Sequence, residues 1–471
     1  MRHTTFAFLL PMAFVVGTPL LHAESHAGYA IQTSPATGGE GTVQQADTNA
    51  YSLPQRNLSM TKRLDFSVGN SFFRNPWVEA PASTDARDGL GPLFNTNSCQ
   101  GCHIKDGRGH PPGVDEPPVS LFLRLAVPAD PEHDAELLKT HGFKPAPVYG
   151  SQLQTAALPA GKPEAKLGLS WKERPVPLAD GTEVVLREPV YTIEAPNYGP
   201  MPDDLLVSPR VAPQMIGMGL LEAIPLEDLK ALADPDDQNG DGISGKLNQV
   251  WDLAAKKTVP GRFGWKAAEP NVHQQSMGAF AGDMGLTSTL KTSTDCTEAQ
   301  DCGRFTNGGT PEVSDKVANF VTFYARSLAV PARRDLNAPS VQQGAKLFNE
   351  AGCAGCHTPK HQTGQVADRP DLSGQDIWPY TDLLLHDMGP ALADGRSVFL
   401  ATGNEWRTPP LWGVGLAKVV NPQAGFLHDG RARTLEEAVL WHGGEAQASA
   451  DHYRHMAAKE RQALIDFLNS L

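Results

Sequence analysis

Apolar and polar residues alternate with different periods along the chain, and each period predicts a type of element. Residues 169–194 alternate every second position around Asp180-Gly181, which predicts two antiparallel strands joined by a tight turn. Residues 226–233 and 311–328 have a helical pattern. Near the end of the chain, apolar residues fall on one face of a closing amphipathic helix: Tyr453, Met456, Leu464, Phe467, Leu468 and Leu471.

The first residues have the pattern of a secretory signal. A short positive start at Arg2 and His3 precedes a mostly apolar run over residues 6–21, and Ala23 supplies a small residue for cleavage. The run is too short and too interrupted to cross a membrane. We therefore expect residues 1–23 to be a signal peptide and the mature protein to be periplasmic, with no membrane span.

Composition narrows the class of protein. The chain has 471 residues and a formal net charge of −13. Nucleic acid is not expected as a partner, because its phosphates need a basic surface. The 45 Gly and 39 Pro residues, with few aromatics, predict long ordered loops around short helices. In such a chain, a bound prosthetic group could fill part of the hydrophobic core in place of side chains.

Two pentapeptides, residues 99–103 and 353–357, have the spacing Cys-x-x-Cys-His. In this motif both thiols add to the vinyl groups of one haem, and the adjacent His becomes the proximal iron ligand. A zinc knuckle would need four ligands gathered from both motifs, and a redox dithiol has no need of the His. We therefore expect two covalently bound haem c groups, attached through Cys99, Cys102, His103, Cys353, Cys356 and His357.

The two other cysteines, Cys296 and Cys302, are close in sequence. In an oxidising compartment they are expected to form a small-loop disulfide. The alternative is a redox-active dithiol, but nothing basic or aromatic nearby would activate it.

Residues 234–244 are rich in oxygen ligands. Asp237, Asn239, Asp241 and Gly242 fit positions one, three, five and six of an EF-hand-type calcium loop. Position twelve is Asn248 rather than Glu, so the bidentate ligand is missing. Calcium and an acidic solvated turn both stay open as interpretations.

The pattern predicts a mainly α protein with two cytochrome c-like haem domains, long ordered loops and a small β-containing insertion in the N-terminal domain. A Leu-Phe-Asn sequence precedes each haem motif, which suggests that a helix delivers each one. The expected organisation is an extended arm over 24–65, an N-terminal haem domain over 66–335 with the insertion at about 111–200, and a C-terminal cytochrome c domain over 336–471.

Several segments resemble the periplasmic dihaem oxidoreductases labelled "thiol oxidoreductase-like", which are related to the bacterial dihaem cytochrome c peroxidase superfamily. The segments that carry the resemblance are 98–112, 208–222, 261–285, 380–395 and 406–444. In that superfamily one haem reacts with peroxide, the other stores or relays an electron, and a Trp lies between them.

The resemblance implies roles for three residues near the first haem. Trp265 corresponds to the bridging Trp. Asp283 corresponds to the distal acidic residue before Met, where the family usually has Glu, and it would move a proton between the oxygens of a peroxide. Arg210 lies in a segment that lacks the His which caps this haem in resting peroxidases, and it would bond a propionate or a bound oxygen ligand. The first iron is thus expected to be open or weakly capped.

For the second haem, the resemblance places the distal ligand after the Leu-Glu-Glu-Ala-Val motif. His442 follows that motif here, where peroxidases often carry Met. A His357/His442 haem would have a lower potential than a His/Met haem. Met388, His386 and Met456 are the rival ligands.

The leading hypothesis is a dihaem oxidoreductase with peroxidase-like chemistry, a reactive first haem and an electron-relay second haem. Its expected partners are a small periplasmic cytochrome c or cupredoxin and a small oxidant such as hydrogen peroxide. One alternative is a non-catalytic dihaem electron carrier with two six-coordinate irons. The other is a thiol oxidoreductase, for which only Cys296 and Cys302 would be available.

Overall fold

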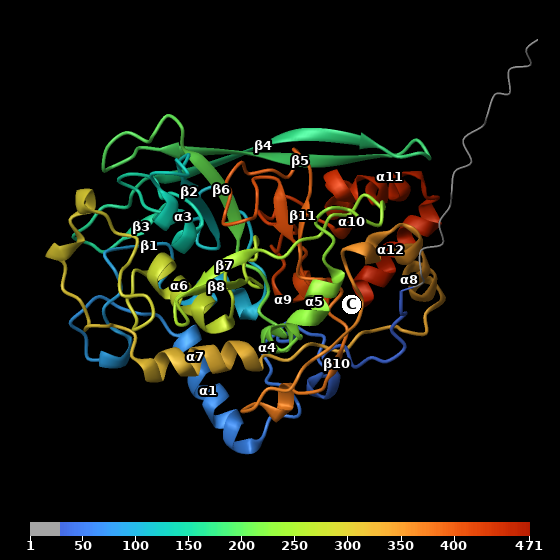
Figure 1. Ribbon diagram of the computed structural model, residues 1–471, viewed down its shortest axis with the longest axis horizontal. Coiled ribbons are helices and arrows are strands. Elements are labelled where there is room, and N and C mark those ends of the chain that lie inside the picture. Colours follow the sequence, from blue (N-terminus) through green and yellow to red (C-terminus); the bar gives the residue numbers. More distant parts are fainter. Residues whose placement is uncertain (1–28) are drawn as a thin grey trace, which may run out of the picture.

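The computed structural model describes residues 29–471, and in that part short helices alternate with two-stranded antiparallel sheets (Figure 1). The helices are α1 Met60–Arg74, α2 Cys99–Cys102, α3 Ala135–His141, α4 Met218–Glu222, α5 Leu226–Leu232, α6 Val272–Met284, α7 Asp315–Ser327, α8 Pro339–Glu350, α9 Ala417–Val420, α10 Leu435–Leu440, α11 Gln447–His455 and α12 Ala458–Ser470. The strands are β1 Leu93–Phe94, β2 Leu121–Ala126, β3 Ala156–Ala157, β4 Lys166–Pro177, β5 Glu183–Glu194, β6 Leu206–Val211, β7 Gln249–Asp252, β8 Lys257–Pro260, β9 His361–Gln362, β10 Asp376–Ile377, β11 Leu385–Asp387 and β12 Glu405–Arg407.

The fold is mixed rather than mainly α, so the expected class is only partly right. Twelve strands pair two by two within residues 29–471, and they occur in both halves of the chain. Frequent Pro and Gly residues keep the helices short, because Pro removes a helical hydrogen bond and Gly costs backbone entropy. The expected signal peptide lies outside the described residues. The expected arm includes the start of α1 at Met60.

Two pairs of helices organise the two halves. α1 packs against α7, and α8 packs against α12. Glycine lies at both crossings: a Cβ on Gly69 would clash with the backbone oxygen of Phe320, and a Cβ on Gly344 would clash with that of Ala463. The expected helices at 226–233 and 311–328 are α5 and α7, and α7 starts late because Ser314 caps it by accepting from the Val317 N–H.

The closing apolar face is divided between two helices, α11 and α12, which are separated at Met456 and Ala457. All six residues of the predicted apolar face are buried: Tyr453, Met456, Leu464, Phe467, Leu468 and Leu471.

The predicted hairpin is present as β4 and β5, each of 12 residues, with Gly181 in the turn at a φ of +82°. The hairpin runs along one side of the molecule from the N-terminal half to the C-terminal helices (Figure 1). Near its base, Leu167 and Ile193 pack against a cluster that contains Leu123 of β2. At its far end, Leu178 belongs to the core of the C-terminal helices.

The two haem motifs are delivered differently. α8 leads into residues 353–357 as expected. The corresponding lead-in to residues 99–103 is not a helix: Leu93 and Phe94 form strand β1, which pairs with β3. Gly91 just before it packs directly against the backbone of Gly285, a close approach that leaves no room for a side chain there.

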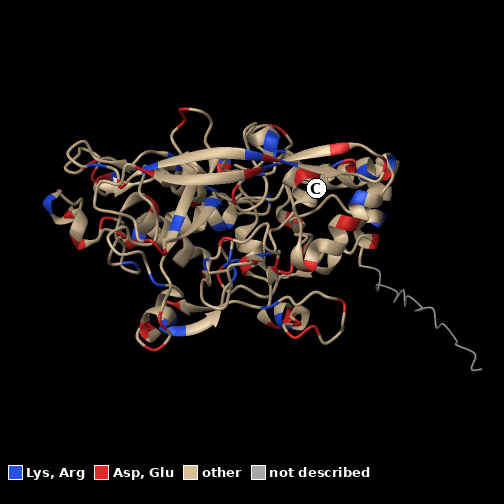
Figure 2. Ribbon diagram, turned by 90° about the horizontal axis from the view of Figure 1, so that it is seen from above, with Lys and Arg blue, Asp and Glu red and all other residues tan. Residues whose placement is uncertain are grey.

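A disulfide joins Cys296 to Cys302, as the sequence predicts, and the other four cysteines take no part in a disulfide. In the described part of the chain, no helix is both long and apolar enough to cross a membrane. Figure 2 shows acidic and basic residues interspersed along the chain rather than gathered on one face.

Candidate functional site

The first Cys-x-x-Cys-His motif forms one helical turn. Ser98 caps α2 by accepting a hydrogen bond from the Gly101 N–H, which fixes the turn that carries both thiols. His103 follows directly, and its Nδ1 donates to the carbonyl of Pro213 at 2.7 Å. This leaves Nε2 with its lone pair free, which is the tautomer a metal ligand needs. Burial lowers the pKa of His103 to about 4, so the ring is neutral at ordinary pH.

His357 in the second motif has the same arrangement. Its Nδ1 donates to the carbonyl of Tyr380 at 3.0 Å, and burial lowers its pKa to about 4. His442, just beyond α10, donates from Nδ1 to the carbonyl of Ala438 at 2.7 Å. Electrostatic interaction with His442 lowers the pKa of His357 further, so the two imidazoles lie within interaction range of each other. Within the described residues, neither Nε2 takes part in a hydrogen bond.

Both ring nitrogens of the rival ligand His386 lie within hydrogen-bond distance of carboxylates. Its Nε2 lies 2.9 Å from Asp382 Oδ2, and its Nδ1 lies 2.8 Å from Glu445 Oε2. Burial lowers the pKa of His386, but Asp382 and Cys356 raise it by more, so the pKa lies well above 6.5. A charged imidazole with both nitrogens hydrogen-bonded has no lone pair for iron. Of the rivals, Met388 and Met456 keep a free thioether.

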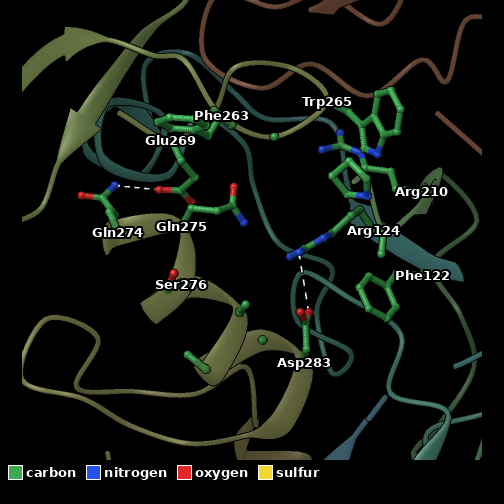
Figure 3. Close-up of a pocket in the computed structure, with 18 of the residues that line it drawn as sticks. Phe122, Arg124, Arg210, Phe263, Trp265, Glu269, Gln274, Gln275, Ser276 and Asp283 are labelled. Atoms are coloured by element: carbon green, nitrogen blue, oxygen red, sulfur yellow. Dashed lines mark hydrogen bonds and ion pairs between the residues drawn. The ribbon is translucent and has the colours of Figure 1, made fainter. Parts of the chain in front are cut away.

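Cys99, Cys102 and His103 line a cavity of about 430 Å³, within the size range of cofactor pockets. One wall is the β2–β6 ribbon, in which Phe122 pairs with Arg210 and Arg124 pairs with Ser208. Strand side chains alternate between faces. Phe122, Arg124 and Arg210 therefore face the cavity (Figure 3), whereas Leu123 packs into the core behind.

Asp283 lies at the end of α6 and points into this cavity toward Arg124 (Figure 3). Gln152 Nε2 donates to Asp283 Oδ1 at 3.0 Å, and Arg124 Nη2 lies 3.8 Å from the same oxygen. Burial raises the pKa of Asp283 above 3.8, and Arg124 and Gln152 offset part of that shift. The carboxyl group thus exchanges protons at a higher pH than an ordinary Asp.

A second, partly buried carboxyl group, that of Glu269, lines the same cavity, and the sequence did not single it out. Gln274 Nε2 donates to Glu269 Oε2 at 2.9 Å, and burial raises the pKa of Glu269. Glu269 comes four residues after Trp265 in a segment quoted above, but a lone Glu before Pro carries no recognisable signal. Figure 3 shows Glu269 and Gln275 together on the side of the cavity away from Phe122.

Trp265 lies at the edge of this cavity and belongs to a small apolar cluster with Leu121, Val211 and Trp406. Its Nε1 donates to the Val211 carbonyl at 2.8 Å. Trp406, which the sequence did not single out as a functional residue, stacks on His428 with ring centroids 3.8 Å apart. Trp265 thus connects the first cavity with β12, a strand that comes from the C-terminal half.

Arg210 is partly buried, and its Nη2 atom, which is shielded from solvent, has no hydrogen-bond partner within residues 29–471. Its Nε donates to Ser208 Oγ at 3.0 Å, and Nη2 lies 3.9 Å from Asp394 Oδ2. Burial lowers its pKa to about 10. An unpaired guanidinium nitrogen is costly in such a place, so it indicates an anionic group that the protein is built to receive.

Charge gives the same indication for the whole cavity. Cationic side chains in the lining outnumber carboxyl groups: Arg108, Arg124, Arg210, Lys291, Arg396 and Arg407 against Glu269, Asp283 and Asp295. A haem carries two propionates, which would compensate part of this excess. Together with the thiol groups of Cys99 and Cys102 and the Nε2 atom of His103, the cavity residues fit a covalently bound haem.

In the candidate calcium loop, the side-chain oxygens accept hydrogen bonds from backbone N–H groups of the same loop. The Asp237 carboxylate accepts from the Gly242 N–H at 3.1 Å, and Asp241 Oδ1 accepts from the Ile243 N–H at 2.9 Å. Asn239 Oδ1 accepts from the Asp241 N–H at 2.8 Å. Across the described residues, no group of three His, Cys, Asp or Glu side chains is placed to hold a metal ion. Calcium binding stays a prediction.

A family model described as "Di-haem oxidoreductase, putative peroxidase" matches residues 31–471. Among solved structures, the chain matches hydrazine synthase of Kuenenia stuttgartiensis, pressurised with 20 bar xenon, at 18% identity and a TM-score of 0.25. This match covers 39% of our chain and 65% of that chain, just under two thirds of its length. So low a TM-score carries no argument about fold or function. A comparison with curated proteins finds no match.

Proposed function

Because the chain belongs to the di-haem oxidoreductase family, and is therefore an enzyme, we propose that it is a peroxidase-like oxidoreductase with two covalently bound haem c groups. When bound, the first haem would supply the reaction centre, and the second would supply the electron relay. The attachment and ligand residues are Cys99, Cys102 and His103 for the first haem, and Cys353, Cys356, His357 and His442 for the second.

The observation that carries this proposal is the difference between the surroundings of the two proximal imidazoles. His357 has His442 as a neighbour with a free Nε2, which favours an iron with two imidazole ligands. The cavity beside His103 presents Asp283, Arg124 and Glu269 instead. When bound there, haem supplies a redox-active iron that can take an oxygen ligand.

Asp283 has the position and the pKa for proton transfer. Cleavage of a peroxide needs a group that takes a proton from one oxygen and gives it to the other. A buried carboxyl group with a raised pKa is suited to both steps. Arg124 beside it stabilises the carboxylate form, and Gln152 fixes the orientation of the carboxyl group. Arg210 neutralises a propionate.

Trp265 is the link between the two haem sites. Its ring lies in the wall of the first cavity, and its cluster includes Trp406 on β12. Arg108 lies over the Trp265 ring with its guanidinium carbon 5.4 Å from the centroid, which orients the ring from the other side. Electrons would pass from the second haem toward the first along this contact.

One observation favours the alternative of a non-catalytic electron carrier. Met215 lines the first cavity, and a thioether ligand from this residue would make the first iron six-coordinate. A thiol oxidoreductase is disfavoured, because haem attachment would consume four cysteines and the other two form a disulfide.

The electron partner and the compartment are further parts of this proposal. We expect a small periplasmic cytochrome c or cupredoxin to dock near the second haem.

The test is the spectrum of the purified, exported protein, after mass measurement of its haem content. We expect two haems, one high-spin and one low-spin, and a spectral change of the high-spin haem on titration with hydrogen peroxide. Two low-spin haems that do not respond to peroxide or cyanide would support the electron carrier instead. A mass with one haem or none would rule out both schemes.

A further inference from the structure

The positive charge around the first cavity exceeds what a haem can neutralise. Six cationic side chains line it, and only three carboxyl groups do. Two propionates reduce the excess, but a ferric porphyrin core adds a positive charge of its own. The cavity therefore still favours a further anion.

The lining arginines differ in how many of their donors are in use. Arg108 and Arg407 each donate to two backbone carbonyls. Arg396 donates to one carbonyl, and Arg210 donates to a serine hydroxyl. Within the described residues, the Arg124 side chain donates no hydrogen bond, and its distance of 3.8 Å from Asp283 is too long for one. Within the described residues, all the guanidinium N–H groups of Arg124 (its donor fork) thus stay available to a ligand.

The surroundings of Arg124 suit a small ligand with two or more oxygens. The residue lies on the cavity face of β2 and points toward the middle of the cavity (Figure 3). A planar guanidinium binds two oxygens of one anion at once, which a point charge does not do. Gln275 and Asp283 lie on α6 in the lining of the same cavity, and the Gln275 amide, or Asp283 in its protonated form, can donate a hydrogen bond to the anion.

We propose that the first haem site binds a small inorganic oxyanion of the nitrite class, held by the Arg124 fork beside Asp283. The inference rests on the proposed function, because it needs an open iron at that haem. It adds the chemical class of a ligand, and it concerns binding only.

The test is an optical titration of the ferric, two-haem protein with sodium nitrite, sodium fluoride and imidazole. In Arg124→Gln, the nitrite Kd should rise about 30-fold, since a hydrogen bond to a charged group is lost along with the charge. In Arg124→Lys, which keeps the charge without the fork, nitrite should weaken as much while fluoride binding is retained. Imidazole, a neutral ligand, should bind unchanged in both variants.

Arg56→Gln is the matched control, because Arg56 is exposed and does not line the cavity; its nitrite Kd should equal that of the wild type. Imidazole binding and haem content show that each variant is folded and loaded. Wild-type protein that binds imidazole and reacts with peroxide but not nitrite would overturn this inference alone. So would an Arg124→Gln variant with an unchanged nitrite Kd. A wild-type first haem that binds none of the ligands would contradict the proposed function itself.

Discussion

The two Cys-x-x-Cys-His regions have the same five-residue pattern but different surroundings. Around residues 99–103 the chain builds a polar cavity from the β2–β6 ribbon and α6, with guanidinium and carboxyl groups in its wall. Around residues 353–357 it packs α8 against α12 and brings His442 near His357. The motif indicates where a haem is attached, whereas the wall opposite the proximal His decides what that haem can do.

The largest expected effect comes from removing one attachment site at a time. Replacing Cys99 and Cys102 by Ser should reduce the protein mass by one haem and abolish the response to peroxide, because the reactive iron is lost. The matched change at Cys353 and Cys356 should remove the other haem while the high-spin spectrum stays. If peroxide still reacts with the first variant, the roles of the two regions are reversed.

The next effect should make the second region resemble the first. His442→Ala removes the imidazole beside His357, so the second haem should change from low-spin to high-spin and bind cyanide or imidazole. EPR and absorption spectra measure this change. His442→Met is the control, because a thioether should keep the iron low-spin and raise its potential. A low-spin His442→Ala protein would make Met388 or Met456 the ligand.

A smaller effect is expected from the carboxyl group of the first region. Asp283→Asn should slow the reaction with peroxide by about 100-fold or more, since proton transfer by a positioned side chain contributes on that scale. Haem content and imidazole affinity should stay the same. Asp283→Glu restores the acid and should recover most of the rate, whereas a purely structural Asp283 would not be rescued in this way.

The pH dependence sharpens the same test. Because the pKa of Asp283 is raised, its deprotonated form is lost on acidification at a higher pH than for an ordinary Asp. The wild-type rate should therefore fall as pH decreases through that raised pKa, and stopped-flow rates measure the fall. Asp283→Asn should lack this acidic limb. An unchanged limb in the variant would assign it to another group, with Glu269 the first candidate.

The smallest effect concerns the helix pairs behind the two regions. Gly344→Ala places a Cβ against the Ala463 oxygen and should reduce the free energy of unfolding by about 1–3 kcal/mol, as overpacking does. Gly69→Ala at the α1–α7 crossing should cost a similar amount. Urea unfolding followed by haem absorbance measures both. If Gly344→Ala leaves stability unchanged, then α8 and α12 are free to move apart.

The sequence predicted the features that depend on residues close to one another in the chain. Cysteine spacing predicted the Cys296–Cys302 disulfide, and alternation around Asp180 predicted the hairpin; both are confirmed. The haem attachment sites, which rest on the same kind of local spacing, stay a prediction. The wall of the first cavity was largely missed because it is assembled at long range. Phe122 pairs with Arg210 across more than eighty residues, and Arg124 faces the cavity only through that register. Nothing near Trp406 or Glu269 in sequence signals the convergence.

The failed helix before residue 99 has a similar cause. Leu93 and Phe94 share a short sequence with the end of α8, but they pair with Ala156 and Ala157 from the insertion. A tertiary partner therefore overrides a local resemblance.

The β4–β5 hairpin has a mechanical consequence. Its base is embedded with β2 in the N-terminal half, and its tip is fixed in the C-terminal half by Leu178 and by Asp180, whose Oδ2 lies 2.7 Å from Arg461 Nη2. The hairpin thus bridges the two halves. A hinge motion that separated them would first have to break the contacts of Leu178 and Asp180 with the C-terminal half. The distance between the two proposed haem irons should therefore stay constant during turnover. Electron transfer between them should not be limited by the rate of a domain motion.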